Sequence, residues 1–555
     1  MGLLGAIDWL VILVYFVTVF AVAYGVTKRE STRETAEGYF LGGRDSGWFV
    51  IGASLFASNI GSEHLVGLAG TGAASGVAVG QFEILAALIL LLLGWLFVPF
   101  YLRSGVFTMP EFLERRYSPA ARWYLAVISI VAYVLTKISV TIAAGGVVFE
   151  ALMGINFWTG ALVVVVATGI YTVFGGLRAV LYTDMLQMFV LVGGSIAVTV
   201  IGLNALGGWG VMYETAGSGF FTLWKPLTDP SFPWLGILLG APILGVWYWC
   251  TDQFIVQRVL AAPDVDQARR GTIFGGFLKV LPLFIFVIPG VIAHALAEQG
   301  RIELATPDQA LPTLIGTLLP AGIRGLVVAG LLAALMSSLS SVFNSCSTLI
   351  TWDIYKKLHP EASERTLVWV GQIATVALVG FGLLWIPMMQ LISGQIYQYL
   401  QSVQAYISPP IAAAFLLGLF WRRVNAQGAV AAFAVGFVLG IGRLIAELNK
   451  DSLSGFLHWY SDINFLYFAF LLFVVCSVVL VLVSLATPEP SDRHIAGLTF
   501  QTAEQEPEQA EAFAIPDARE HLPAVESDPG WRRRDLQLSV VLVVVVGIIW
   551  LYFTG

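Results

Sequence analysis

Residues 57–64 read Ala57-Ser58-Asn59-Ile60-Gly61-Ser62-Glu63-His64, a polar run inside an apolar stretch long enough to cross a membrane. An ionisable group at membrane depth costs at least about 2.5 kcal/mol, so such a run needs a reason to be there. With Gly61 in its middle, the run suits a broken helix whose freed carbonyls and helix ends face a cavity. A polar contact between two helices, made by Ser58 and Asn59, is the alternative.

The sequence around this run is that of an integral membrane protein. Of its 555 residues, 57% are hydrophobic and 12% are charged, too few polar side chains to cover a soluble domain. Fourteen stretches can cross about 30 Å of hydrocarbon, and none alternates like a barrel strand, so we expect an all-α membrane protein. The predicted spans are 8–27, 48–73, 81–102, 121–152, 157–174, 183–205, 236–259, 271–298, 322–351, 367–389, 393–420, 427–446, 462–486 and 537–554.

Basic residues follow the loop-by-loop pattern that marks the cytoplasmic side of a membrane. With the N-terminus outside, 22 of the 29 Lys and Arg residues, Arg258 among them, fall in inner loops, and only Lys137 and Lys279 fall within spans. Both termini are then extracellular or periplasmic, in a multi-pass protein of the plasma membrane or bacterial inner membrane. The net charge of -7 comes largely from residues 504–528, so we expect no nucleic acid partner.

Other spans also carry polar groups that lipid disfavours. Glu83 and Lys279 suit a buried ion pair that holds two helices together, lines a cavity, or does both. The run Trp247-Tyr248-Trp249-Cys250-Thr251-Asp252-Gln253 combines aromatic rings with hydroxyl, amide and carboxylate groups. A sugar site needs both, because rings stack on C–H faces while the sugar hydroxyls require paired hydrogen bonds. An aromatic belt at the membrane interface is the alternative.

The run Ser337-Ser338-Leu339-Ser340-Ser341 offers closely spaced hydroxyls on one helix. Such hard neutral oxygens suit Na⁺, whereas serines that bond back to their own helix are the alternative. The three cysteines, Cys250, Cys346 and Cys476, lie in apolar runs and are expected to be buried thiols. The chain has no Walker loop, metal-ligand spacing or HExxH motif, so we expect a transporter and not an enzyme.

Five segments resemble the sodium/glucose cotransporters of the solute:sodium symporter family, and the similarity covers nearly the whole chain. They are 52–62, 64–76, 175–184, 247–253 and 335–341. The resemblance implies a LeuT-like core of two inverted five-helix repeats that hold substrate and ion near the bilayer midplane. It divides the chain into a first helix and cytoplasmic loop (1–47), repeat 1 (48–205), an extracellular loop (206–235), repeat 2 (236–420), peripheral helices (421–486), a cytoplasmic linker (487–536) and a last helix (537–555).

The resemblance also implies site residues. It assigns the sodium site to backbone oxygens of Ala57, Ile60 and Ala334 and to the hydroxyls of Ser337 and Ser338. The sugar-facing positions are Asn59, His64, Glu83, Tyr248, Trp249, Lys279 and Gln401, with Tyr248 as an inner gate that stacks on the sugar. A second ion site in some members corresponds to Ser58, Ser340, Ser341 and Asp184.

Two alternatives within this assignment bear on function. The serines of the second ion site could instead only fill space between helices, with Asp184 capping a helix that starts near Thr183. Gly245, Gln398 and Gln404 stand where the animal glucose carriers have threonine, aspartate and threonine, so the choice among hexoses and polyols stays open.

The sequence therefore predicts a symporter that moves a sugar, a glucose- or galactose-like hexose, with one or two Na⁺ by alternating access. Its partners are the sugar, sodium and the lipid bilayer. The alternatives are a Na⁺ symporter for inositol, a carboxylate or another small polar solute, and a non-transporting sugar sensor or a channel. Glu83 disfavours an anionic solute, whereas Lys279 favours one.

Overall fold

The computed structural model describes residues 4–28, 44–61, 63–106, 108–389, 396–502 and 527–554 of the chain. Within these ranges the regular structure is helical, apart from two isolated β-bridges that pair Thr222 with Thr554 and Lys225 with Pro233. The three cysteines are free and buried, as predicted. The predicted all-α class is confirmed.

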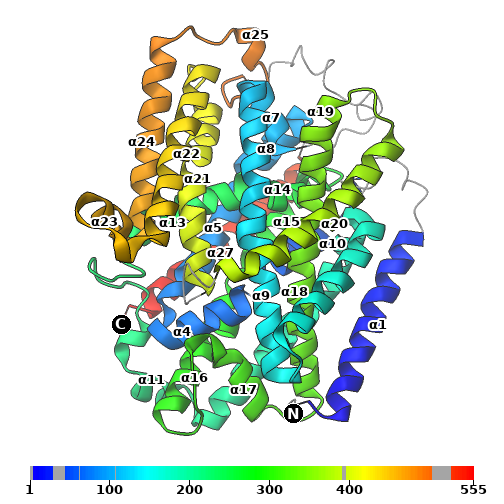
Figure 1. The fold of residues 1–555 in the computed structure, drawn as a ribbon, viewed down its shortest axis with the longest axis vertical. Coiled ribbons are helices and arrows are strands. Elements are labelled where there is room, and N and C mark those ends of the chain that lie inside the picture. The colour runs from blue at the N-terminus through cyan, green and yellow to red at the C-terminus, as the bar shows by residue number, and fades with distance from the viewer. Residues whose placement is uncertain are drawn as a thin grey trace.

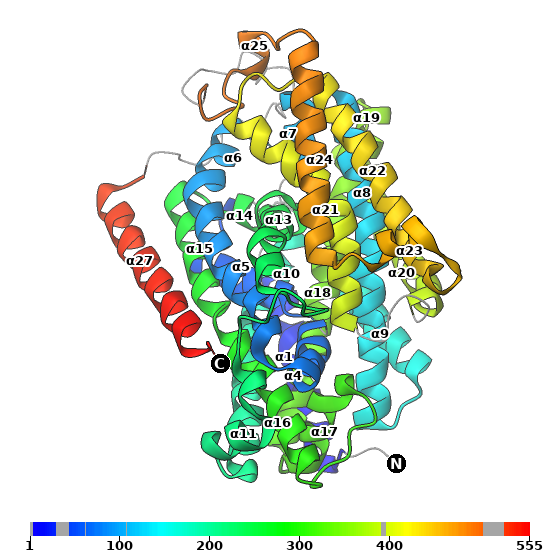
Figure 2. The ribbon, with the colours of Figure 1, turned by 90° about the vertical axis from the view of Figure 1, so that its left-hand side faces the viewer.

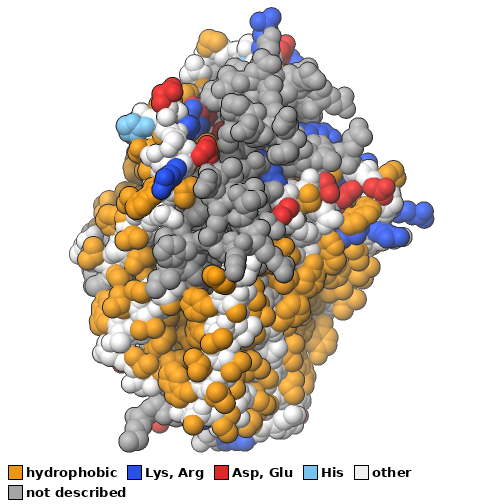
Figure 3. Space-filling view, turned by 90° about the vertical axis from the view of Figure 1, so that its right-hand side faces the viewer, with side chains coloured by type: hydrophobic (Ala, Val, Ile, Leu, Met, Phe, Trp, Pro, Cys, Tyr) orange, Lys and Arg blue, Asp and Glu red, His pale blue; other side chains and the backbone are white. Residues whose placement is uncertain are grey.

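Twelve helices of the described residues are long and apolar enough to cross a membrane, and two shorter apolar helices, Trp48–Asn59 and Phe157–Gly169, complete the fourteen predicted spans. Figure 3 shows a broad hydrophobic surface over the lower part of one face, with the Lys, Arg, Asp and Glu side chains mostly above it. A surface of this kind suits the hydrocarbon of a bilayer, in which the helices satisfy their own backbone groups.

The helices fall into three groups along the chain. Residues 48–206 form α3 (Trp48–Asn59), α4 (Ala69–Ser75), α5 (Gln81–Leu92), α6 (Val98–Ser104), α7 (Met109–Arg116), α8 (Pro119–Tyr133), α9 (Ser139–Val148) and α10 (Phe157–Leu206). Residues 209–420 form α11 (Trp209–Ala216), α12 (Trp234–Leu239), α13 (Ala241–Gly245), α14 (Gln253–Leu260), α15 (Val265–Leu278), α16 (Ile288–Glu298), α17 (Ala310–Leu318), α18 (Ile323–Thr348), α19 (Lys356–Leu358), α20 (Glu364–Met389) and α21 (Ile396–Phe420). The flanking helices are α1 (Ala6–Lys28), α22 (Ala426–Leu448), α23 (Gly455–Asp462), α24 (Phe465–Ala486), α25 (Asp492–Ile495) and α27 (Pro529–Tyr552).

Helix α3 ends at Asn59, within the polar run of residues 57–64. Ile60 leaves the helical conformation, with φ -78° and ψ 88°. The Gly61 amide donates to the Asn59 carbonyl, two residues back, instead of to Ala57. A π-helical turn, η2 (Glu63–Leu68), then leads into α4. The predicted broken helix is therefore confirmed, and the Ala57 carbonyl is released from the helix hydrogen-bond ladder.

A second break lies in the span predicted at 236–259. Helix α13 leads into another π-helical turn, η8 (Val246–Thr251), and Asp252 is extended, with φ -82° and ψ 129°. The Asp252 carboxylate then caps α14 by accepting from the Phe254 amide at 3.2 Å. Paired breaks in the two halves of a chain are typical of inverted-repeat transporters. The bounds of the two repeats stay a prediction.

The chain from Phe157 to Leu206 forms one continuous helix of 50 residues, α10. The sequence predicts two separate spans here, 157–174 and 183–205, and the predicted interruption between them is wrong, because residues 175–182, Gly175 and Gly176 among them, are helical. A glycine costs a helix only about 1 kcal/mol, and the apolar residues on both sides favour its continuation. Its two apolar stretches, Phe157–Gly169 and Val180–Leu206, correspond to the two predicted spans.

Helix α18 lies at the centre of the molecule and is buried along most of its length. It packs against α10, α1 and α3. Figures 1 and 2 show α10 and α18 within the bundle, whereas α1, α24 and α27 lie on its outside. The serine run of α18 is therefore held next to the break at the end of α3.

Both ends of the segment 487–536, predicted as a linker, carry helices where the structure describes them. Helix α27 begins at Pro529 and not at 537, because Asp528 accepts from the Trp531 amide and caps it. Before the segment 503–526, which lies outside the described residues, Phe500 donates its amide to Leu419 at 3.0 Å and packs its ring against Phe100. The predicted linker is thus folded at both of its ends.

Both ends of the chain lie in the lower half of Figure 1, whereas α7 and α25 lie at its top. The sequence predicts that the two termini share one side of the membrane. The compartment that this side faces stays a prediction.

Candidate functional site

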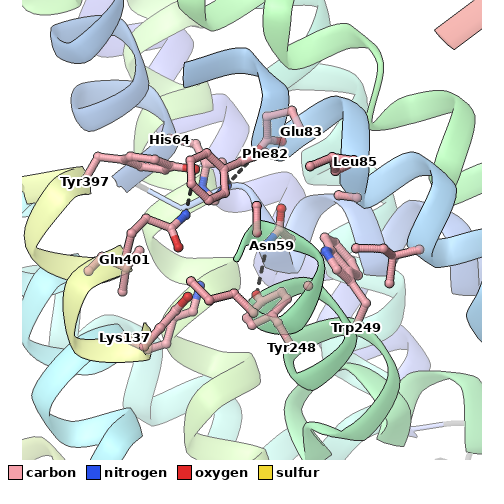
Figure 4. A pocket seen from close by; sticks show the side chains of 17 residues that line it. Asn59, His64, Phe82, Glu83, Leu85, Lys137, Tyr248, Trp249, Tyr397 and Gln401 are labelled. Carbon is pink, nitrogen blue, oxygen red and sulfur yellow. Dashed lines mark hydrogen bonds and ion pairs between the residues drawn. The ribbon is translucent and has the colours of Figure 1, made fainter. Parts of the chain in front are cut away.

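A cavity of about 60 Å³ opens between α5, η8, α21 and the end of α3. Figure 4 shows its polar and aromatic side chains converging from these elements. Six of the seven residues predicted to face the sugar line this cavity, and the seventh, Lys279, is hydrogen-bonded to two of them. The six are Asn59, His64, Glu83, Tyr248, Trp249 and Gln401.

Lys279 and Glu83 form an ion pair that borders the cavity. The Lys279 ammonium, at the end of α15, donates to the Glu83 carboxylate and to the Asn59 side-chain carbonyl. The other Glu83 oxygen lies 3.3 Å from His64 Nε2. The pair therefore joins three helical segments and at the same time fixes the polar groups of the cavity wall.

Tyr248 and Trp249 form one aromatic wall. The Tyr248 hydroxyl accepts from Asn59 Nδ2 at 3.0 Å, and the two rings meet edge to face with centroids 5.1 Å apart. Both residues are buried. The alternative of an aromatic belt at the membrane interface is therefore wrong for this run, because the two rings line a cavity inside the bundle.

The opposite wall contains two aromatic residues that the sequence does not reveal, Phe82 and Tyr397. Their ring centroids lie 6.0 Å apart, and the Tyr397 hydroxyl accepts from Gln401 Nε2 at 2.8 Å. This bond orients Gln401, whose side-chain carbonyl accepts no hydrogen bond from the residues that the structure describes. Only the spacing of four residues between Tyr397 and Gln401, one helical turn, hints that they share a face.

Two of the three positions that depart from the animal glucose carriers, Gly245 and Gln404, line the cavity. Gln398 is half-buried and does not. The two departures that the resemblance implies at Gly245 and Gln404 therefore fall on the surface of the cavity.

A second ion pair, Lys137 with Glu63, also borders the cavity. Lys137 lines it, and its Nζ donates to Glu63 Oε1 at 2.9 Å while lying 4.9 Å from the centre of the Tyr248 ring. The sequence places Lys137 within a span without a partner, since the two residues are 74 positions apart. With this pair, the positive charges of two lysines equal the negative charges of two glutamates around the cavity when His64 is neutral.

Of the predicted sodium-site residues, Ala57, Ile60 and Ser338 lie at the break in α3. Ser338 Oγ on α18 donates to the Ser58 carbonyl at 3.2 Å, and Ala334 lies one turn before it on the same buried helix. Ile60 and the released Ala57 carbonyl belong to the break itself. Ser337 instead donates to Asp184 Oδ1 at 2.5 Å, so one predicted ligand of this site faces the second ion cluster.

The second predicted ion site is a buried cluster around Asp184. Asp184 Oδ2 accepts from Ser58 at 2.8 Å, and Ser341 donates to Ser58 Oγ at 3.1 Å. Asp184 lies in the middle of α10, so its alternative role as a helix cap near Thr183 is wrong. Ser340 bonds back to the Ser337 carbonyl at 3.0 Å and is not brought to Asp184 by this bond.

Two members of the Asp184 cluster are missing from the sequence-based assignment, Ser54 and Arg258. Ser54 Oγ donates to Asp184 Oδ2 at 2.6 Å, and Arg258 Nε donates to Ser58 Oγ at 2.8 Å. Arg258 is fully buried on α14, so counting it with the inner loops is wrong. Because Arg258 lies near the end of a predicted span, hydropathy alone places it in a loop and does not predict that its guanidinium is buried.

Comparison with known proteins identifies the family. A family model described as the sodium:solute symporter family matches residues 39–436. The chain belongs to this family. Sodium/glucose cotransporter 1 of Oryctolagus cuniculus is 38% identical, over 94% of this chain and 85% of the relative. The sodium/myo-inositol cotransporter of Mus musculus is 40% identical, over 90% of this chain and 76% of the relative.

Among solved structures, a substrate-bound, outward-open Na⁺-coupled sialic acid symporter aligns with a TM-score of 0.73 and 23% identity. The alignment covers 88% of this chain and 99% of that structure, and confirms the LeuT-like fold. As a member of the sodium:solute symporter family, the chain is a sodium-coupled solute symporter of a membrane and not an enzyme.

Proposed function

We propose that this symporter carries a neutral sugar, a glucose- or galactose-like hexose, together with Na⁺ across the cell membrane by alternating access. The supporting observation is the charge balance of the cavity. Lys137 and Lys279 are each paired with a glutamate, Glu63 and Glu83. A carboxylate or ammonium solute would bring an extra charge into this balanced, buried site, whereas a neutral solute does not.

The geometry of the cavity also supports a polyhydroxylated solute. Aromatic rings on two sides, Tyr248 with Trp249 and Phe82 with Tyr397, offer faces for the C–H groups of a sugar ring. Asn59, Glu83 and Gln401 offer donors and acceptors for its hydroxyls. A site built on such bonds rejects analogues that lack the matching hydroxyl, because its own polar groups are then left unpaired.

The second candidate solute is myo-inositol, since its cotransporter is as similar to this chain as the glucose carriers are. Uptake of labelled glucose, galactose and myo-inositol into proteoliposomes, with Na⁺ or K⁺ outside, separates the two. We expect a hexose to be taken up best and only with Na⁺. Preferred uptake of myo-inositol would replace the hexose in the proposal, and solute binding without uptake would favour a sensor.

We assign one Na⁺ to the break in α3, with Ala57, Ile60, Ala334 and Ser338 supplying oxygens. A second Na⁺ is assigned to the Asp184 cluster. Each Na⁺ that enters down a tenfold gradient and a 100 mV potential supplies about 3.7 kcal/mol. One ion then sustains a sugar gradient of about 500-fold and two ions about 10⁵-fold.

Alternating access needs an ion that binds one conformation better than the other. The proposed first site meets this requirement, because its oxygens come from α3 and α18, on either side of an interface between packed helices. Na⁺ held between them favours the outward-open state and raises sugar affinity by linkage.

A further inference from the structure

The Glu63 carboxylate is a buried anion beside the sugar cavity, and only one of its two oxygens accepts a hydrogen bond from the residues that the structure describes. Glu63 opens the η2 turn after the break in α3 and is fully buried. One of its oxygens, Oε1, accepts from Lys137 Nζ at 2.9 Å. The other, Oε2, has no hydrogen-bond partner among the residues that the structure describes. A buried carboxylate oxygen without a partner is rare and calls for an explanation.

The unpaired oxygen lies where the predicted Na⁺ ligands gather. A Cβ placed on Gly61 would collide with Glu63 Oε2, and would lie 2.7 Å from the Glu63 carboxyl carbon and 2.8 Å from Ser338 Oγ. Glu63 Oε2 and Ser338 Oγ therefore flank one small volume at the helix break. Oxygens this close can share a hard cation, which for an ion of the size of Ca²⁺ or Na⁺ takes oxygens at about 2.3–2.6 Å.

We propose that Glu63 Oε2 is a ligand of the coupling Na⁺ and that Lys137 connects this ion to the sugar cavity, an inference that rests on the proposed Na⁺ and sugar sites. The donor set is then a carboxylate, a serine hydroxyl and backbone carbonyls, all hard oxygens that suit Na⁺. The Glu63 carboxylate bridges two cations, with Na⁺ on Oε2 and the Lys137 ammonium on Oε1.

This Glu63 bridge between Na⁺ and Lys137 couples the binding of the ion to the binding of the sugar. When Na⁺ occupies Oε2, the single negative charge of Glu63 is shared, so its attraction for Lys137 falls. Lys137 lines the cavity beside the Tyr248 ring and then donates more readily to a sugar hydroxyl. By linkage, a sugar that engages Lys137 strengthens the hold of Glu63 on Na⁺ by the same factor.

The test is equilibrium binding of ²²Na⁺ to the purified full-length protein without sugar, with K⁺ keeping the ionic strength constant. Glu63→Gln preserves the shape of the side chain and removes its charge. We expect its half-saturating Na⁺ concentration to rise at least tenfold. Glu447→Gln is the matched control, because that carboxylate lies on the peripheral helix α22, where it accepts from the Tyr406 hydroxyl, and we expect the variant to bind Na⁺ as wild type does.

The variant Lys137→Gln distinguishes two roles of Glu63. Either Glu63 binds Na⁺ directly, or its ion pair with Lys137 only stabilises the fold. If Glu63 binds Na⁺ directly, losing its competing cation leaves Na⁺ affinity unchanged or higher. The proposal is overturned if Glu63→Gln binds Na⁺ within twofold of wild type, or if Lys137→Gln weakens binding as much as Glu63→Gln does.

The double variant Glu63→Gln/Lys137→Gln covers the case in which a single variant does not fold, because it leaves no unpaired buried charge. The expected result is again a tenfold weaker Na⁺ affinity, and an affinity within twofold of wild type overturns the proposal. Sugar uptake by the wild-type protein tests the proposed function separately, so a failure of the Glu63 assignment is distinguishable from a failure of sugar symport.

Discussion

Lys279→Met removes the cation that faces Glu83 inside the bundle. The side chains of Lys279 and Glu83 are 1% and 4% exposed, so solvent screens the carboxylate that is left behind only weakly. Removing one partner of a buried ion pair costs about 3–5 kcal/mol of stability. His64, 3.3 Å from Glu83, offsets only part of this cost because it must first take up a proton.

The same substitution should weaken sugar binding. Lys279 fixes both Asn59 and Glu83, which line the cavity. Hydrogen bonds that involve charged groups contribute about 1.5–3 kcal/mol, which corresponds to a loss of affinity of roughly 10- to 150-fold. We expect Lys279→Met to lower both the melting temperature in detergent and the affinity for labelled sugar.

The double variant Glu83→Gln/Lys279→Met separates these two effects. It removes both charges, so we expect it to recover most of the lost melting temperature while sugar affinity stays low. Scanning fluorimetry and equilibrium sugar binding on the same preparations provide the two readouts. A single variant that melts with the wild type and binds sugar within twofold of it would refute this account of the ion pair, as would a double variant with normal sugar affinity.

Three further predictions concern the other site residues. Gln401→Ala should cost about 1–3 kcal/mol of sugar-binding free energy, a loss of affinity of roughly 5- to 150-fold in a binding assay, and an affinity within twofold of wild type would exclude this residue as a contact. The double variant Ser337→Ala/Ser338→Ala should fold normally yet show no Na⁺ stimulation of sugar binding, and full stimulation would place the ions elsewhere. The reversal potential of sugar-coupled current should correspond to two Na⁺ per sugar, and Ser340→Ala should leave it unchanged because Ser340 bonds back to its own helix; a one-to-one ratio would reduce the Asp184 cluster to a structural role.

Much of the site could be predicted because charge at membrane depth is a strong signal. Glu83, Lys279 and the run around Gly61 are conspicuous in apolar sequence, and each of them lies at the cavity or at the helix break. The break itself follows from local chemistry, since a glycine among polar residues disfavours an uninterrupted helix. These features need no knowledge of which helices touch.

The rest depends on contacts between distant parts of the chain. Phe82 stands between Gln81 and Glu83, and Tyr397 stands four residues before Gln401, yet an isolated aromatic residue gives no signal of its own that it lines a cavity. The Lys137–Glu63 pair joins two spans whose proximity only the fold reveals. Arg258 lies at the end of a span, where hydropathy alone suggests a loop, yet it is buried against the serines of α3.

The most direct test of the central claim is a paired flux measurement in proteoliposomes, with ²²Na⁺ and labelled hexose followed in the same vesicles. Sodium-coupled sugar symport predicts that external hexose increases Na⁺ entry, and that an inward Na⁺ gradient drives hexose above its external concentration. Replacement of Na⁺ by K⁺ should abolish that accumulation. Hexose entry that only equilibrates, at the same rate in Na⁺ and in K⁺, would contradict the account.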